Sequence, residues 1–285
     1  MKLEFKNVNH IYMPGTPFEK TALADINLSI RSGSFTGLIG HTGSGKSTLI
    51  QHLNGLLHPT SGQILVDGQD ISEKKYDRRG LRFRVGLVFQ YPEHQLFDET
   101  VFSDIAYGPK NMGLPPDEIE RRVHEALSYV GLDPDILPRS PFELSGGQKR
   151  RVAIAGVLAM QPDVLILDEP TAGLDPRGRD EILGHICDLH KKTHNTVIFV
   201  SHSMEDVGRI CDDIIVMKDG HIQMHDTKQA VFTRVDQLLE MNLDVPQITS
   251  VVSYLNTQGM NLPADIYTVE AAKQAILQAT EDAPC

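Results

Sequence analysis

The sequence predicts an α/β fold: a nucleotide-binding core, a helical stretch inserted into it, and a short helical appendage at its end. Three observations indicate this fold. A glycine-rich, phosphate-binding pattern at Gly40–Thr48 lies between an apolar strand and a helix. A second apolar strand, Val164–Leu167, is followed by two carboxylates. Strand and helix patterns alternate on both sides of a mostly helical stretch, residues 91–162.

The elements follow in order from apolar periodicity and turn residues. Residues 1–90 and 163–235 form the predicted core, residues 91–162 the helical subdomain, and residues 236–285 the appendage. Predicted strands lie at Leu3–Val8, Ile26–Ile30, Ser34–Ile39, Gly62–Val66, Val85–Phe89, Val164–Leu167, Thr196–Val200 and Ile214–Met217. Predicted helices outside the insert lie at Thr48–Leu53, Asp180–Lys191, Met204–Ile210, Gln247–Leu255 and Val269–Ala279.

The phosphate-binding pattern supplies each group that a bound nucleotide needs. Glycines let backbone N–H groups curl around phosphate oxygens without a Cβ in the way. Lysine places a positive charge on the phosphates, and the next hydroxyl ligates Mg²⁺. An ordinary glycine-rich turn is the alternative, and the strand before and helix after the loop argue against it. The loop residues are Gly40, His41, Thr42, Gly43, Ser44, Gly45, Lys46, Ser47 and Thr48.

The two carboxylates that follow the strand Val164–Leu167 are suited to bind a metal ion and to transfer a proton. An uninterrupted apolar run is typical of a parallel strand buried on both faces, and ligands bind at the carboxyl ends of such strands. Asp168 suits the outer shell of Mg²⁺, and Glu169 can accept a proton from water. A strand-ending acidic turn is the alternative; the phosphate loop elsewhere in the chain makes it the weaker interpretation.

A third segment, Leu144–Gln148, predicts a second anion-binding site. Ser145 can cap a helix that continues through Met160, and Gly146 and Gly147 leave its first N–H groups bare. A simple capped helix is the alternative. One active site hardly needs two phosphate cradles, whereas two copies of the chain placed head to tail do.

Together these segments resemble the ATP-binding cassette (ABC) family over most of the chain. The resemblance implies a P-loop NTPase (RecA-like) core with an antiparallel β subdomain, and it implies ATP and Mg²⁺ as ligands. It makes Glu169 the catalytic carboxylate and His202 the switch histidine. It makes Gln90 a contact to Mg²⁺ or the attacking water, and Tyr12 the aromatic on which adenine stacks. The resemblance makes Leu144–Gln148, which ends at Gln148, the signature segment, and Ala172–Asp175 the D-loop.

In Gly40–Thr42 and Met13–Phe18 the chain most resembles the second of the two ATPase types of energy-coupling factor (ECF) transporters. Further segments resemble ECF ATPase subunits in general. They are Gly55–Gly62, Gln90–Phe97, Ser140–Glu143, Ala155–Leu158 and Ala172–Arg179. This resemblance implies three partners: a second ATPase subunit, identical or different, a transmembrane coupling subunit, and a substrate-binding membrane subunit. It implies a peripheral position on the cytoplasmic face of the cell membrane and uptake of a vitamin or transition-metal ion.

Composition agrees with this interpretation. The net charge of −11 argues against non-specific nucleic-acid binding, and no nucleic-acid partner is expected. The basic residues between Lys74 and Arg84 favour a solvated edge over a lipid or RNA surface. No apolar run reaches the ~18–20 residues that a spanning helix needs. Cys187, Cys211 and Cys285 show no metal or disulfide spacing.

Two other function classes share some of these motifs. A soluble ABC ATPase acting on ribosomes or DNA is the alternative function, although its usual second cassette or coiled-coil insert is missing. A P-loop kinase or G-protein has no use for Leu144–Gln148.

The segment after Gln90 predicts a docking surface for the membrane partner. Thr100 can cap a helix with Val101 and Ile105 on one face. Glu93, Asp98 or Glu99 are candidate counter-charges for an arginine on the partner's coupling helix.

Overall fold

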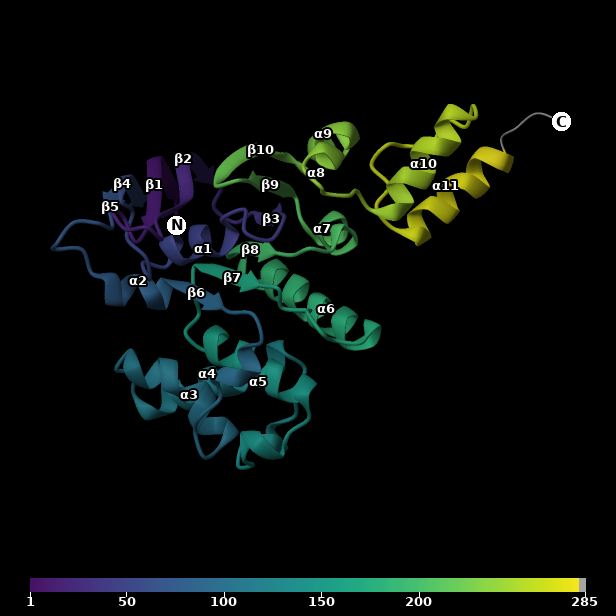
Figure 1. Ribbon diagram of the computed structural model, residues 1–285. Helices are drawn as coiled ribbons and strands as arrows, with labels where there is room; N and C mark the ends of the chain where they lie inside the picture. Colours follow the sequence, from purple (N-terminus) through teal and green to yellow (C-terminus); the bar gives the residue numbers. More distant parts are fainter. Residues whose placement is uncertain (282–285) are drawn as a thin grey trace.

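The computed structural model describes residues 1–281. Its strands form two sheets, seen in Figure 1. The smaller, antiparallel sheet has the order β2-β1-β4-β5, from β1 (Leu3–Tyr12), β2 (Lys20–Ile30), β4 (Ser61–Val66) and β5 (Gln69–Asp70). The larger sheet has the order β10-β9-β3-β8-β7-β6, from β3 (Phe35–Gly40), β6 (Val85–Val88), β7 (Val164–Asp168), β8 (Thr196–Val200), β9 (Asp213–Lys218) and β10 (His221–Thr227).

The larger sheet positions the site. Its strands are parallel except β10, which pairs antiparallel with β9. Every residue of β3, β6 and β8 is buried, as expected of strands covered on both faces. Because β3 and β7 lie on either side of β8, the phosphate loop after β3 and the carboxylates after β7 reach the same edge of the sheet.

Between β6 and β7 the chain forms only helices, which occupy the lower lobe in Figure 1. They are α3 (Val101–Asn111), α4 (Pro116–Tyr129) and α5 (Gly146–Leu158), joined by short 3₁₀ turns at Pro92–Gln95 (η1), Pro134–Ile136 (η2) and Pro141–Glu143 (η3). Thr100 caps α3 by accepting a hydrogen bond from the Ser103 N–H at 3.1 Å, and Val101 and Ile105 are fully buried. The predicted cap and the shared face of Val101 and Ile105 are confirmed, but that face packs into the core and is not available to a partner.

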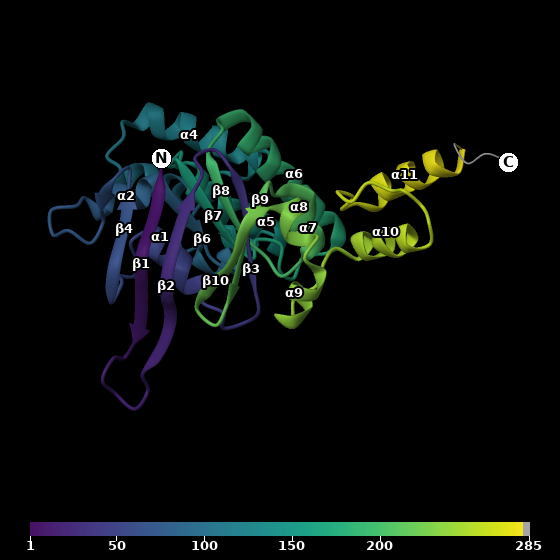
Figure 2. The ribbon, with the colours of Figure 1, turned by 90° about the horizontal axis from the view of Figure 1, so that it is seen from above.

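The remaining helices cover the sheet or extend from it. They are α1 (Lys46–Leu53), α2 (Arg78–Arg84), α6 (Pro176–Thr193), α7 (Met204–Ile210), α8 (Lys228–Phe232), α9 (Val235–Glu240), α10 (Gln247–Thr257) and α11 (Val269–Glu281). Leu238, Met241 and Leu243 pack into the main hydrophobic core. By contrast, α10 and α11 bury Val252 and Ile266 in a small cluster of their own. Both ribbon views show α10 and α11 projecting from the body (Figure 2).

Several predicted boundaries need correction. The helix after the phosphate loop begins at Lys46 rather than Thr48, because the chain enters it directly from Gly45. The signature helix ends at Leu158 rather than Met160. The basic stretch contains a short helix, α2, and Arg84 forms ion pairs with Asp67 and Asp163 of its own chain.

No helix among residues 1–281 is both long and apolar enough to cross a bilayer. Within the same range no cluster of three or more His, Cys, Asp or Glu side chains could hold a metal ion. Cys187 and Cys211 are free thiols, and Cys285 lies outside the described residues.

Candidate active site

The phosphate loop joins β3 to α1, and its glycines are required for two different reasons. Gly45 has φ 104° and directly precedes α1; a Cβ there would lie 2.6 Å from the Ala22 carbonyl oxygen. Gly43 has φ 84° and open space beside it. Gly45 therefore permits close packing, and Gly43 permits a left-handed turn with its backbone accessible to a ligand.

Lys46 is held at the start of α1 by the loop itself. Its ammonium donates hydrogen bonds to the carbonyl oxygens of Gly40 at 2.7 Å and His41 at 3.2 Å. Burial lowers the pKa of Lys46, against the opposing charges of Glu169 and Asp168. Ser44 lies beneath the loop with a buried hydroxyl that has no hydrogen-bond partner among the described residues. The lysine is thus positioned before any nucleotide binds.

A pocket of about 190 Å³ opens beside the loop. Its lining residues are Tyr12, Lys20, Ala22, Gly43, Gly45, Lys46, Ser47 and Thr48. The Tyr12 hydroxyl lies 3.2 Å from the Thr48 hydroxyl, so the ring at the end of β1 is fixed to α1. At the other end of the loop, His41 Nε2 lies 3.5 Å from an Asp219 carboxylate oxygen. The structure thus places Tyr12 beside the loop, although the two lie far apart along the chain.

The two carboxylates lie at the carboxyl end of β7. Burial raises the pKa of Asp168, and the charge of Lys46 opposes this shift. Burial, helped by the charge of Asp168, raises the pKa of Glu169 to about 7. Glu169 has φ 51°, in the left-handed region, so its side chain departs from the strand direction. A carboxyl group with a pKa near neutrality suits general-base chemistry.

His202 faces Glu169 from the loop between β8 and α7. Its Nε2 lies 3.3 Å from Glu169 Oε1 without hydrogen-bonding geometry, so that buried oxygen has no bond among the described residues. Ser203 caps α7 through the Asp206 N–H at 3.2 Å. Arg179 of α6 binds the buried Asp206 carboxylate at 2.9 Å and also contacts Ser203. These contacts fix the loop that carries His202.

The signature segment forms the start of α5 and lies apart from the phosphate loop. The Ser145 hydroxyl accepts from the Gln148 N–H at 3.3 Å, and the Gln148 side chain accepts from the Ser145 N–H at 3.0 Å. This is a capping box, which the Ser-x-x-Gln spacing signals. A Cβ at Gly146 or Gly147 would meet nothing within 4 Å. No residue of this segment lines the pocket beside the loop, so the chain does not bring its two predicted phosphate cradles together.

Two further predicted residues occupy the loops between these elements. Gln90 is exposed, two residues beyond the end of β6. Asp175 caps α6 by accepting from the Gly178 N–H at 2.9 Å. Asp175 therefore has a structural role in its own chain, whatever else it contacts.

One residue near the site carried no sequence signal. Arg150, on α5, is 3% exposed and forms an ion pair with Glu93 at 2.8 Å. The partners lie 57 positions apart in sequence, and only the fold brings them together. This pair overturns the expectation that Glu93 is available to a membrane partner, because both of its oxygens are bound within the chain.

Comparison with known proteins identifies the family. The model of the family described as "ABC transporter" matches residues 23–172, more than half of the chain. The chain belongs to the ABC transporter family. Within it, the chain is 56% identical to the energy-coupling factor transporter ATP-binding protein EcfA2 of Clostridium perfringens, over 98% of both chains. It is 48% identical to EcfA2 of Geobacillus kaustophilus, over 98% of this chain and 97% of that protein.

Solved structures agree with this ABC ATPase in fold. A structure of cbiO1 from Clostridium perfringens, described as part of the ABC transporter complex cbiONQ, matches with TM-score 0.74 and 41% identity. It covers 88% of this chain and 98% of that chain. The ATP-binding cassette MJ0796, dimeric and bound to ADP and Pi, matches with TM-score 0.69 and 29% identity, over 79% and 98%. The protein is thus an ATPase with the P-loop NTPase fold, among the ATP-binding proteins of ECF transporters.

Proposed function

We propose that this ABC ATPase works as a head-to-tail dimer that couples ATP hydrolysis to ECF-type import of a vitamin or transition-metal ion. The observation that supports the dimer is the separation of its two phosphate cradles. The pocket beside Lys46 has no lining residue from the signature segment, and the exposed start of α5 has open space at Gly146 and Gly147. A second subunit, identical or different, would supply Ser145 to the phosphates held by this chain. The related cassette MJ0796 is described as dimeric.

Within each composite site the residues take the roles that their positions suit. Tyr12 stacks on adenine, and the phosphate loop holds the phosphates. Glu169 accepts the proton of the attacking water, and His202, 3.3 Å from Glu169, contacts the γ-phosphate. Phosphoryl transfer then depends on positioning and electrostatic stabilisation.

The residues present also suit Mg²⁺. Ser47, Gln90 and Asp168 offer oxygen ligands, which Mg²⁺ prefers, and the buried Asp168 carboxylate gains from a neighbouring cation. When bound, Mg²⁺ would offset the phosphate charge.

A groove supports coupling to a membrane partner. Its volume is about 390 Å³, and its walls come from α2, from the segment after Gln90, from α3 and from α5. Phe97 and Tyr107 are 61% and 52% exposed there and pack edge to face with ring centroids 5.1 Å apart. A transmembrane coupling subunit would dock a short helix in this groove, and a separate membrane subunit would bind the substrate. The ATPase would then lie on the cytoplasmic face of the membrane.

A reconstituted transporter tests the groove. Phe97→Ser with Tyr107→Ser should release the membrane partner and abolish uptake while ATP binding persists, because the substitutions remove apolar docking area and leave the nucleotide pocket unchanged. Leu239→Ser is the matched control, since Leu239 is 53% exposed on α9, outside the groove. Normal co-purification and uptake in the double variant would place the coupling surface elsewhere.

A further inference from the structure

The side chain of Arg150 connects three segments of the ATPase that the chain brings together only by folding. Its guanidinium donates to both carboxylate oxygens of Glu93, at 2.8 and 3.0 Å. A third nitrogen donates to the carbonyl oxygens of Ala172 at 2.6 Å and Pro170 at 3.3 Å. Arg150 itself lies in the second turn of α5, so one buried side chain joins α5, η1 and the segment after β7.

Each of these three segments also lies next to a residue of the candidate site in the sequence. Glu93 lies three positions after Gln90, Pro170 directly follows Glu169, and α5 begins next to Ser145. Arg150 has no hydrogen bond to any of these three residues within the described chain. Its contacts therefore act on their positions and not on the reacting atoms.

The backbone beside two of these contacts is strained. Tyr91, next to η1, has φ 55°, and Glu169 has φ 51°. Non-glycine residues rarely adopt this left-handed region, and they stay in it only where surrounding contacts hold them. The Arg150 guanidinium lies 5.9 Å from the centre of the Tyr91 ring, over its face, which adds a cation–π contact at one of the two strained positions.

The Glu93 carboxylate is kept in its charged form although it is largely buried beside Arg150. Burial, the largest single effect, acts to raise the pKa of Glu93. The hydrogen bonds from Arg150 and from the Glu93 N–H, together with the nearby positive charges, outweigh it, and the pKa lies below its ordinary value. The four contacts use the planar fork of an arginine, with donors spread over three nitrogens. A lysine ammonium is a single point of charge and cannot reach both carboxylate oxygens and both carbonyls.

We propose that Arg150 is a positioning residue for ATP hydrolysis, which holds the segments beside Gln90 and Glu169 in fixed relation to α5. Without the side chain, ATP still reaches its pocket, because neither Arg150 nor any of its hydrogen-bond partners lines that pocket. The attacking water and its base, however, lose their alignment. A misplacement of about 1 Å in such a site can cost about 100-fold in rate.

The test separates this role from simple stabilisation. Arg150→Lys should lower kcat about 10- to 100-fold, with the KM for ATP changed less than about twofold. Arg150→Met with Glu93→Leu replaces the ion pair by an apolar pair, which restores stability in comparable buried pairs because no charge is left unpaired. This double variant should regain the wild-type melting temperature yet keep the low kcat, since the contacts to Pro170 and Ala172 stay absent.

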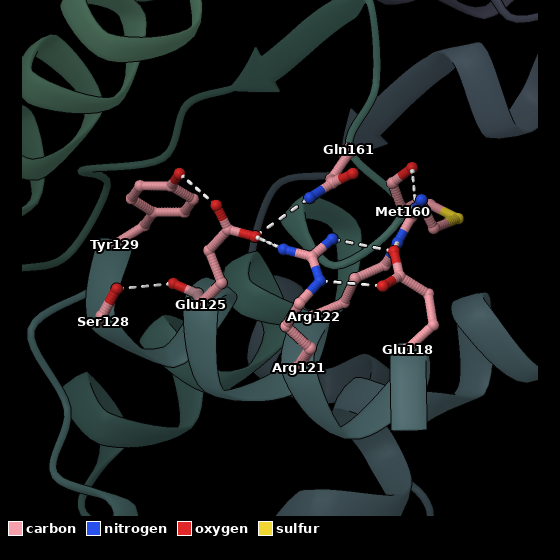
Figure 3. Close-up of polar contacts among 8 residues, drawn as sticks. All are labelled: Glu118, Arg121, Arg122, Glu125, Ser128, Tyr129, Met160 and Gln161. Atoms are coloured by element: carbon pink, nitrogen blue, oxygen red, sulfur yellow. Dashed lines mark hydrogen bonds and ion pairs between the residues drawn. The ribbon is translucent and has the colours of Figure 1, made fainter. Parts of the chain in front are cut away.

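Arg122 on α4 provides the matched control. It is also a largely buried arginine of the helical lobe, paired with Glu118 at 2.7 Å and donating to the Met160 carbonyl oxygen at 3.3 Å, as Figure 3 shows. Arg122→Met with Glu118→Leu should leave kcat and KM unchanged. All variants are measured in the full-length chain with any subunits that purify with it. Wild-type kcat in Arg150→Lys, or kcat restored together with stability in the Arg150 double variant, would overturn the proposal.

Discussion

Replacing Glu169 by glutamine separates binding from chemistry at this site. The amide keeps the shape of the side chain but cannot accept a proton, so turnover should fall by about 10²–10⁴. ATP binding should persist, because the proposed phosphate ligands, the loop and Lys46, are unchanged. The comparison variant Lys46→Ala should instead weaken binding, since it removes the charge that the Gly40 carbonyl oxygen positions at 2.7 Å. Steady-state hydrolysis and equilibrium binding of a fluorescent ATP analogue measure the two effects separately.

The same substitution has a second, pH-dependent consequence. The pKa of Glu169 is about 7 in the folded chain, raised by burial and by Asp168 from an ordinary value of 4.5. Between these values the folded state binds the proton more tightly than the unfolded state does. Stability therefore falls as pH rises through this window, and the full cost is present above about pH 7. The upper bound is about 3 kcal/mol, and residual solvent contact reduces it to about 1–2 kcal/mol.

Glu169→Gln should therefore stabilise the protein by about 1–2 kcal/mol at pH 8 and have almost no effect at pH 4, which lies below the unfolded-state pKa of 4.5. Urea unfolding at the two pH values measures this difference. The exposed carboxylate of Glu240 on α9 provides a control substitution, Glu240→Gln, with no comparable effect. The wild-type kcat/KM should also fall as pH drops below about 7, because the base becomes protonated. Wild-type turnover in Glu169→Gln, or equal stabilisation at both pH values, would refute the assignment of the base and the account of its burial.

Two further predictions concern the assembly. Ser145→Arg should block hydrolysis in the site that uses the partner's phosphate loop, while the mutant chain still binds ATP; in a mixed dimer with one mutant chain, loss of that chain's own site would contradict the head-to-tail arrangement. Deleting the chain after Pro246 removes α10 and α11, which leave Tyr254 and Val269 about two-thirds exposed; it also removes Tyr267 from the main core but spares the core contacts of Leu238. Analytical ultracentrifugation should then show weaker nucleotide-free association, and unchanged association would favour a purely intramolecular role.

Local sequence patterns predict most elements of this fold because they depend on neighbouring residues. The apolar run at Val164–Leu167 and the capping residue Thr100 each specify their element directly. The same is true of the phosphate loop, whose glycines and Lys46 follow one another in the chain. The fold does the rest for the site: parallel order brings the loop after β3 and the carboxylates after β7 to one edge.

Contacts between residues far apart in the sequence could not be predicted, because local patterns contain no information about distant partners. Nothing near Glu93 in the sequence indicates that Arg150 will bind it, and its position after Gln90 suggested an exposed surface. The basic stretch before Arg84 is a solvated edge, as predicted, since Arg79, Arg82 and Arg84 are exposed. What the sequence did not indicate is that Arg84 forms ion pairs with Asp67 and Asp163 from two other segments. A charged residue's partner depends on tertiary structure, which periodicity does not encode.

The Glu93–Arg150 pair also changes how movement would pass from the ATP site to the groove. The turn η1 is bound on its inner side to α5 through this pair, and the next residues present Leu96 and the exposed Phe97 to the groove. Phe97 and Asp98 are in turn anchored by N–H bonds to the buried Asp104 carboxylate of α3, at 3.2 and 3.3 Å. A displacement of α5 would therefore carry η1, Phe97 and α3 together. We expect a docked membrane helix to follow the helical lobe as one body, and not a flexible loop.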